Sequence, residues 1–240
     1  MSKMRKMYYL RFLGRCLTLA ACVVLYFLYP KSFDVLDGFH FFRKFSPLHI
    51  LWAIWMFDMA CQLIPIKKHV PLGSQKLFAQ HYRPASEAVK KDALRKYMNK
   101  SARSAALVLV LWVAFIGAIG GLYFLDIIDK KILFLFSACF YVCDLICVLF
   151  WCPFRLMLKN RCCTTCRIFN WDHMMMFSPL VFIGGFYAGS LMLVALAVLG
   201  LWELFAFIHP ERFWQGSNKA LQCVNCTDKL CTQCCQKQRK

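Results

Sequence analysis

Apolar stretches without charge alternate along this chain with short basic segments. Residues 104–125 are 22 consecutive positions without a charge, and residues 173–202 are 30 positions without Asp, Glu, Lys or Arg. A helix of about 20 such residues crosses the ~30 Å hydrocarbon layer of a bilayer. The pattern therefore predicts an all-α fold, a polytopic integral membrane helical bundle.

We expect about five transmembrane helices from the lengths of the apolar blocks. The first begins at Cys16, behind a basic N-terminus, and ends at Pro30; we interpret it as an uncleaved span rather than a signal peptide. The next three are expected at about residues 45–66, 104–125 and 132–153.

The last apolar block, residues 174–209, fits no simple crossing. Its 36 residues are too many for one upright helix and too few for two crossings joined by a turn. A short re-entrant piece is expected to end at Gly184-Gly185 or at Gly189-Ser190, where the helix is weakest. We favour a single crossing for this block.

Basic residues set the expected orientation. Residues 67–103 contain ten Lys and Arg, whereas the loops after the first and third spans contain three and two. Cytoplasmic loops carry the excess of Lys and Arg, so we expect a multi-pass protein of the cell membrane with a cytoplasmic N-terminus. The side of the tail stays open, because one final crossing places it outside while its own basic residues favour the inside.

The same pattern divides the chain into parts. Residues 1–66 hold the first two spans, and 67–103 form a basic cytoplasmic loop. Residues 104–210 hold the other three spans with a Cys-rich cytoplasmic loop at 154–173, and 211–240 form a Cys-rich basic tail.

An amphipathic helix is expected within the long cytoplasmic loop. Pro84 can start it, and one stripe then carries Ala85, Val89, Ala93 and Tyr97, with Lys and Arg on the remaining surface. Such a helix either lies on anionic lipid headgroups or serves as a solvated connector.

Composition excludes whole classes of protein. The chain is 60% hydrophobic and 18% charged, with a mean hydropathy of +0.51. These values exclude intrinsic disorder and argue against a soluble enzyme. The net charge is +18, and the basic residues flank the apolar blocks. We therefore expect anionic lipid headgroups as partners, and no nucleic acid.

Three acidic residues fall inside the predicted spans: Asp58, Asp144 and Glu203. A charge at mid-bilayer is costly and usually marks a functional site. Asp58 precedes Cys61, and Asp144 precedes Cys147, so each pair shares one helix face. The two Asp are expected to face each other and to share a proton, a cation or a donor; the alternative is a purely structural role.

Cysteines gather at the predicted cytoplasmic surface. The tail reads CxxC-x4-CxxC with Cys223, Cys226, Cys231 and Cys234, and this spacing suits zinc or an iron–sulfur cluster. A split site that combines one tail CxxC with Cys163 and Cys166 is an alternative, as are disulfides if the tail is outside.

The end of the fourth span, Cys147 to Pro153, resembles over a few residues the CxxxCP element of membrane-bound ferredoxin-type quinol oxidoreductases. Its spacing is one residue longer, and no ferredoxin cluster motif follows. With the thiols gathered on one membrane face, this favours electron transfer over an inert role.

These observations give three competing functions. The leading one is a membrane-anchored metal-binding protein with a redox role. The second is a transporter or channel for a cation or metal that uses the intramembrane acids. The third is a non-catalytic assembly subunit, with membrane protein partners and a structural zinc. The sequence contains no Ser-His-Asp, P-loop or dinucleotide signature. Whether the protein is an enzyme stays open at this point.

Overall fold

The computed structural model describes residues 3–64, 78–85, 91–158 and 166–225. The regular structure of these residues is helical, without a β-strand among them. Within the described ranges, four helices are long and apolar enough to cross a membrane. They are α1 (Lys3–Leu28), α4 (Lys91–Phe124), α5 (Lys130–Leu149) and α8 (Gly185–Ile208).

A shorter apolar helix, α2 (Leu48–Leu63), takes the place of the second predicted span. Its 16 residues extend about 24 Å at 1.5 Å per residue, which is less than a full hydrocarbon layer. The predicted count of five spans is therefore not confirmed, whereas the all-α class and the apolar helices are.

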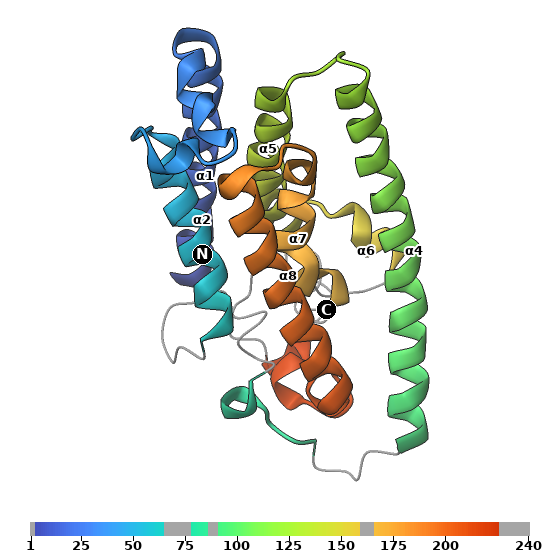
Figure 1. Cartoon of the computed structure of the whole chain (residues 1–240). Coiled ribbons are helices and arrows are strands. Elements are labelled where there is room, and N and C mark those ends of the chain that lie inside the picture. Colours follow the sequence, from blue (N-terminus) through green and yellow to red (C-terminus); the bar gives the residue numbers. More distant parts are fainter. Residues whose placement is uncertain (1–2, 65–77, 86–90, 159–165, 226–240) are drawn as a thin grey trace.

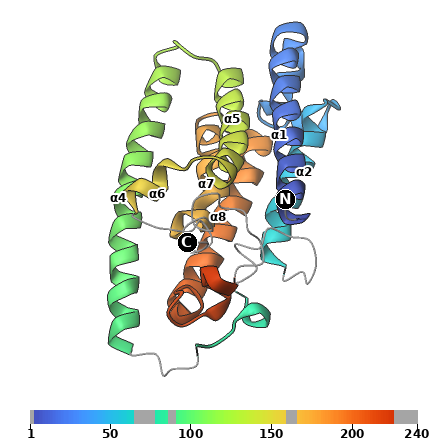
Figure 2. The same cartoon turned by 180° about the vertical axis from the view of Figure 1, so that it is seen from behind.

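The helices run alternately up and down (Figures 1 and 2). The turns η1 (Pro30–Leu36) and η2 (His40–Phe42) join α1 to α2 near the end of the molecule where α4 also turns into α5. The opposite end holds the η3 turn (Ala79–His81), the start of α4 and the end of α8.

An aromatic core holds α2, α5 and the last third of the chain together. Trp55 is fully buried, and its ring lies 5.0 Å from Phe177 and 5.6 Å from Phe134. Tyr187, also fully buried, donates a hydrogen bond of 2.9 Å to the carbonyl of Leu48. Most of α1 is instead exposed along its apolar side chains, as expected of a surface that faces lipid.

The last apolar block breaks at Gly184-Gly185, one of the two predicted positions. The short α7 (Asp172–Phe177) and η6 (Ser178–Phe182) form an ascending limb, and α8 then descends. Gly184 and Gly185 have φ values of +70° and +77°, which glycine adopts without strain. A glycine pair can therefore reverse the chain direction inside the bundle.

Among the described residues, the predicted amphipathic segment does not form a helix of its own: Ala93 and Tyr97 belong to α4. Residues 86–90, including Val89, lie outside the described residues, and Lys91 already belongs to the 34-residue α4. No Gly or Pro interrupts the chain from Lys91 to Ile116, so the basic segment and the apolar span propagate as one helix.

The start of the tail lies beside the end of the long loop. Pro84 and Asn218 form an isolated antiparallel bridge, the amide of Lys219 donates 2.7 Å to the carbonyl of Arg83, and that of Ala85 donates 3.0 Å to Ser217. Residues 83–85 and 217–219 are therefore on one side of the bundle. This geometry disagrees with a single crossing by the last block, which would separate them.

Candidate functional site: a charged cluster between two cavities

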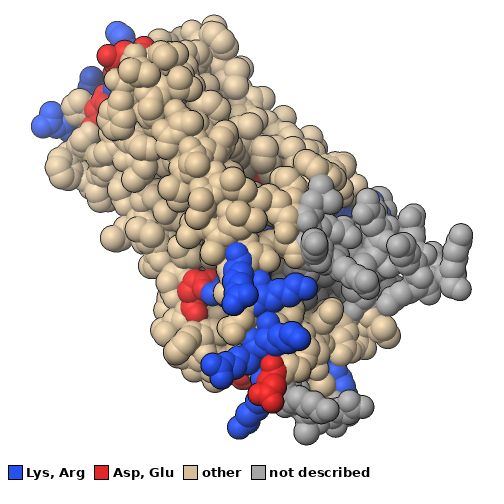
Figure 3. Space-filling view, turned by 90° about the vertical axis from the view of Figure 1, so that its right-hand side faces the viewer, with Lys and Arg blue, Asp and Glu red and all other residues tan. Residues whose placement is uncertain are grey.

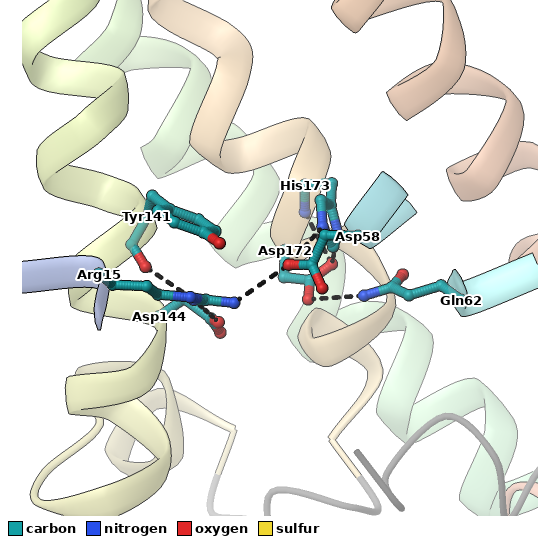
Figure 4. A network of polar contacts seen from close by, with 7 residues as sticks. All are labelled: Arg15, Asp58, Gln62, Tyr141, Asp144, Asp172 and His173. Atoms are coloured by element: carbon teal, nitrogen blue, oxygen red, sulfur yellow. Dashed lines mark hydrogen bonds and ion pairs between the residues drawn. The ribbon is translucent and has the colours of Figure 1, made fainter. Parts of the chain in front are cut away.

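Arg15 joins the two predicted acids across the bundle (Figure 4). Its Nη1 donates to Oδ2 of Asp144 at 2.6 Å, and its Nη2 to Oδ2 of Asp58 at 3.3 Å. Nη1 also donates to the carbonyl of Tyr141 at 2.7 Å, and the guanidinium lies 3.9 Å from the centre of the Tyr141 ring. The two carboxylates thus share a donor, which is one of the three predicted arrangements.

The sequence interpretation placed Arg15 in the basic head before the first span, and this was wrong. Helix α1 begins at Lys3 and continues without interruption to Leu28, so Arg15 lies in its middle. The side chain is only 12% exposed, because α1 packs along α5 and presents Arg15 to Asp144. The available signal was one cation directly before an apolar run, opposite two acids without an assigned partner.

A second arm of the cluster comes from α7. Oδ1 of Asp172 accepts from the backbone amide of His173 at 2.7 Å and lies 2.8 Å from its Nδ1. Gln62 of α2 donates to Oδ2 of Asp172 at 3.2 Å. The His173 Nε2 lies 3.8 Å from Oδ2 of Asp58, which is ion-pair distance rather than a hydrogen bond.

His173 lies outside the long helices and is 3% exposed. Burial lowers the pKa of its imidazole, but the carboxylates of Asp172 and Asp58 raise this pKa by more, so that it reaches about 10. His173 is therefore positively charged at neutral pH. Three carboxylates then face the Arg15 guanidinium and the imidazolium, with Arg11 beside them, and such pairing reduces the cost of burial.

The two Asp-x-x-Cys pairs bring their carboxylates together in the bundle, but not their thiols. Asp58 and Asp144 meet at Arg15, yet Cys61 and Cys147 line different cavities. Each thiol lines a cavity together with the Asp of its own pair: Cys61 with Asp58 in one, and Cys147 with Asp144 in the other.

Glu203 does not belong to this cluster. Its Oε1 accepts from Arg167 Nε at 3.1 Å and from Trp171 Nε1 at 2.8 Å, and its Oε2 pairs with Arg167 Nη2. These contacts attach α8 to the turn η5 (Arg167–Trp171). Of the three predicted intramembrane acids, Glu203 thus has a separate, bidentate partner.

A small polar cavity adjoins the cluster. Its volume is about 100 Å³, enough for a few water molecules. Its lining comes from α1, α2, α5 and α7. It consists of the cluster residues Arg15, Asp58, Gln62, Asp144, Asp172 and His173, together with Tyr8, Arg11 and Cys61.

A larger cavity of about 340 Å³ lies on the other side of Asp144 and Asp172, which line both. Its surface is almost entirely apolar. Four cysteines contribute to it, and aromatic side chains from α4, α5 and the following segments form much of the wall. The cysteines are Cys143, Cys147, Cys152 and Cys166, and the aromatic residues are Trp112, Phe140, Trp151, Phe154 and Phe169.

The thiols of Cys147 and Cys152 interact with each other. Cys147 is in the last turn of α5, and Cys152 follows the helix directly before α6 (Pro153–Met157). Cys139 and Cys143 form a second contact one turn earlier, but Cys139 is exposed and does not line the cavity. Both members of the Cys147–Cys152 pair therefore line the cavity that Asp144 and Asp172 also line, whereas only Cys143 of the other pair does.

Most predicted metal ligands fall where nothing is described. Four of the predicted ligands lie outside the described residues: Cys163, Cys226, Cys231 and Cys234. The backbone of Cys223 starts η9 (Cys223–Asn225), but its side chain is not described. Cys166 is half-buried and lines the apolar cavity. Among described residues, no group of three or more His, Cys, Asp or Glu is arranged to hold a metal.

Comparisons with protein-family models, with curated proteins and with solved structures find no match to this chain.

Proposed function

We propose that the protein is a membrane-embedded thiol redox protein. In this proposal Cys147 and Cys152 form the redox pair, and the apolar cavity admits a lipid-soluble quinone as their two-electron acceptor. The observation that carries the proposal is that Asp144 and Asp172 line both this thiol-bearing cavity and the polar one. Redox chemistry that moves protons needs such ionisable groups beside an apolar binding site.

The reaction balances without a further reactant. Two S–H bonds break and one S–S bond forms between Cys147 and Cys152. The two electrons reduce the quinone, and its two oxygens take up the two protons, which gives the quinol. An ionised Asp144 beside the pair can accept a thiol proton, and thiolate is the reactive form in such exchange.

The cavity suits a quinone ring by size and by chemistry. Its volume of about 340 Å³ lies at the lower end of the range for small-molecule sites. Aromatic walls stack favourably on a planar ring, and Met175 and Met176 add polarisable thioethers to the lining. A lipid-soluble ligand is also the kind that can reach a cavity among apolar helices.

Cation transport through the acids is less well supported. Asp58 and Asp144 are already bonded to Arg15, which has acceptors on two helices. A passing cation would need to displace this guanidinium. A relay that shifts protons among Asp144, Asp172 and His173 requires no such displacement.

The test uses the purified protein in detergent with a water-soluble short-chain ubiquinone. We expect quinol formation, followed by absorbance, together with a Cys147–Cys152 disulfide identified by peptide mass spectrometry. Cys147→Ser should abolish both signals. Cys139→Ser is the matched control, because Cys139 is on the same helix but faces away from the cavity.

Equal quinone reduction by the Cys147→Ser protein and the wild type would refute the proposal. So would a quinone-dependent disulfide that joins other cysteines while Cys147 and Cys152 stay reduced.

Metal binding by the tail remains a separate hypothesis. We expect Cys223→Ser with Cys226→Ser to release most bound zinc or iron, measured by elemental analysis. Full retention of metal would exclude the tail as its site. A colourless protein with stoichiometric zinc would favour a structural role for that metal, as in an assembly subunit.

A further inference from the structure

A groove between α4 and α8 lies apart from both cavities of the charged cluster. Its volume is about 510 Å³. Lys91, Arg95 and Asn99 line one wall from successive turns of α4, and Phe207 lines the other from the end of α8. Arg167 completes the polar part of the lining.

The groove carries positive charge. The described residues that line it include Lys91, Arg95 and Arg167, and none of them is Asp or Glu. Arg167 is paired with Glu203, whereas Lys91 and Arg95 are exposed. Figure 3, which faces this side of the molecule, shows a group of Lys and Arg, with some Asp and Glu among them, at the lower end next to a broad surface without charge.

The groove is also amphipathic. Leu94 and Met98 alternate with the polar residues along α4, and Phe207 is 85% exposed. Helix α4 changes here from a basic segment to the uncharged residues 104–124, so the groove lies at the boundary between the two. A fitting ligand has an anionic head and an apolar body.

We propose that this groove binds one anionic phospholipid, with its phosphate at Lys91 and Arg95 and its acyl chain along Met98 and Phe207. Basic pockets between transmembrane helices near the membrane surface are known to take such headgroups. Free inorganic phosphate shares the charge but cannot use the apolar wall. The inference is independent of the proposed redox function.

The experiment counts bound lipid by native mass spectrometry. The full-length protein is reconstituted in phosphatidylcholine nanodiscs with and without phosphatidylglycerol, and then released into detergent. We expect one retained phosphatidylglycerol, and about a tenfold loss of retention in Lys91→Gln/Arg95→Gln. Phe207→Ala should weaken retention without a change in charge.

A matched variant separates a site from general attraction. Lys96→Gln/Lys100→Gln removes the same charge from the same helix segment, but neither residue lines the groove. We expect this variant to retain the lipid as the wild type does, with the folded fraction of each variant checked by circular dichroism.

Equal loss in the two double variants would overturn the site, because only diffuse surface attraction would remain. Displacement of the lipid by millimolar inorganic phosphate would overturn the choice of lipid over free phosphate. Retention of phosphatidylcholine as strongly as phosphatidylglycerol would overturn the role of the headgroup charge.

Discussion

Arg15 compensates two carboxylates from different helices, so its removal deprives both of the guanidinium that they share. We expect Arg15→Gln to lower the free energy of unfolding by about 3 to 5 kcal/mol, as for other broken buried ion pairs. Arg15→Lys should recover little of this stability, because one ammonium cannot reproduce the forked guanidinium that reaches Asp58, Asp144 and the Tyr141 carbonyl. Unfolding in mixed detergent micelles measures the effect.

The control for this prediction is Arg43→Gln, which removes an exposed cation and should cost less than about 0.5 kcal/mol. The double variant Arg15→Gln/Asp144→Asn should be more stable than Arg15→Gln alone, since it removes an uncompensated charge. If Arg15→Gln is as stable as the control, the ion pairs do not hold the bundle together.

His173 gives the cluster a predictable dependence on pH. Its pKa of about 10 in the folded protein lies above the usual value of 6.5, so protonation stabilises the fold. This contribution is complete below about pH 6.5 and is lost as the pH rises towards 10. The charged groups that face the imidazole are Asp172 on α7, Asp58 on α2 and Asp144 on α5.

We therefore expect the difference in stability between the wild type and His173→Gln to shrink steadily from pH 6.5 to pH 10. Thermal unfolding of both proteins across this range measures it, and groups that titrate alike in both proteins cancel. A difference that stays constant over the range would show that His173 is not a charged member of the cluster.

At the scale of elements, the reversal before α8 depends on two glycines. A Cβ on Gly185 would lie 2.8 Å from the amide nitrogen of Gly38 and 2.8 Å from the carbonyl oxygen of Leu36. The next residue, Phe186, donates a hydrogen bond of 2.8 Å to the carbonyl of Gly38. The connector between α1 and α2 is thus packed directly on the start of α8.

Gly185→Ala should lower the free energy of unfolding by more than about 1 kcal/mol, because both the positive φ and the close backbone contact oppose a side chain. Gly189→Ala is a control on the same helix, where a Cβ meets open space. It should be neutral or gain up to about 1 kcal/mol. Equal effects of the two substitutions would contradict the packing of this reversal.

For the whole molecule, the contacts of residues 217–219 with 83–85 predict that the tail and the long basic loop share one side of the membrane. Because that loop carries ten Lys and Arg, we expect the cytoplasmic side. Green fluorescent protein fused after residue 240 should fluoresce in a bacterial host, and alkaline phosphatase at the same position should be inactive.

Fusions within the turn between α4 and α5 should give the opposite pattern, since this turn lies at the other end of the bundle. Active phosphatase at the C-terminus would contradict the shared side. It would restore the single crossing that the length of the last apolar block suggested.

Hydrophobic pattern and charge by themselves determined the helical class, the approximate positions of the long apolar helices and the break near Gly184. These features follow from local rules, because helix length and the cost of charge in hydrocarbon are properties of a segment. The same rules identified Asp58 and Asp144 as residues that need a partner.

Only the tertiary structure decided which partner that is. Arg15, His173 and Asp172 reach the cluster from helices far apart in sequence, and Glu203 finds its cation in η5 instead. Likewise, the rotation of α5 about its axis against its neighbours decides that the Cys147 side chain faces the apolar cavity. Packing between helices fixes these pairings, and no periodicity within one helix encodes them.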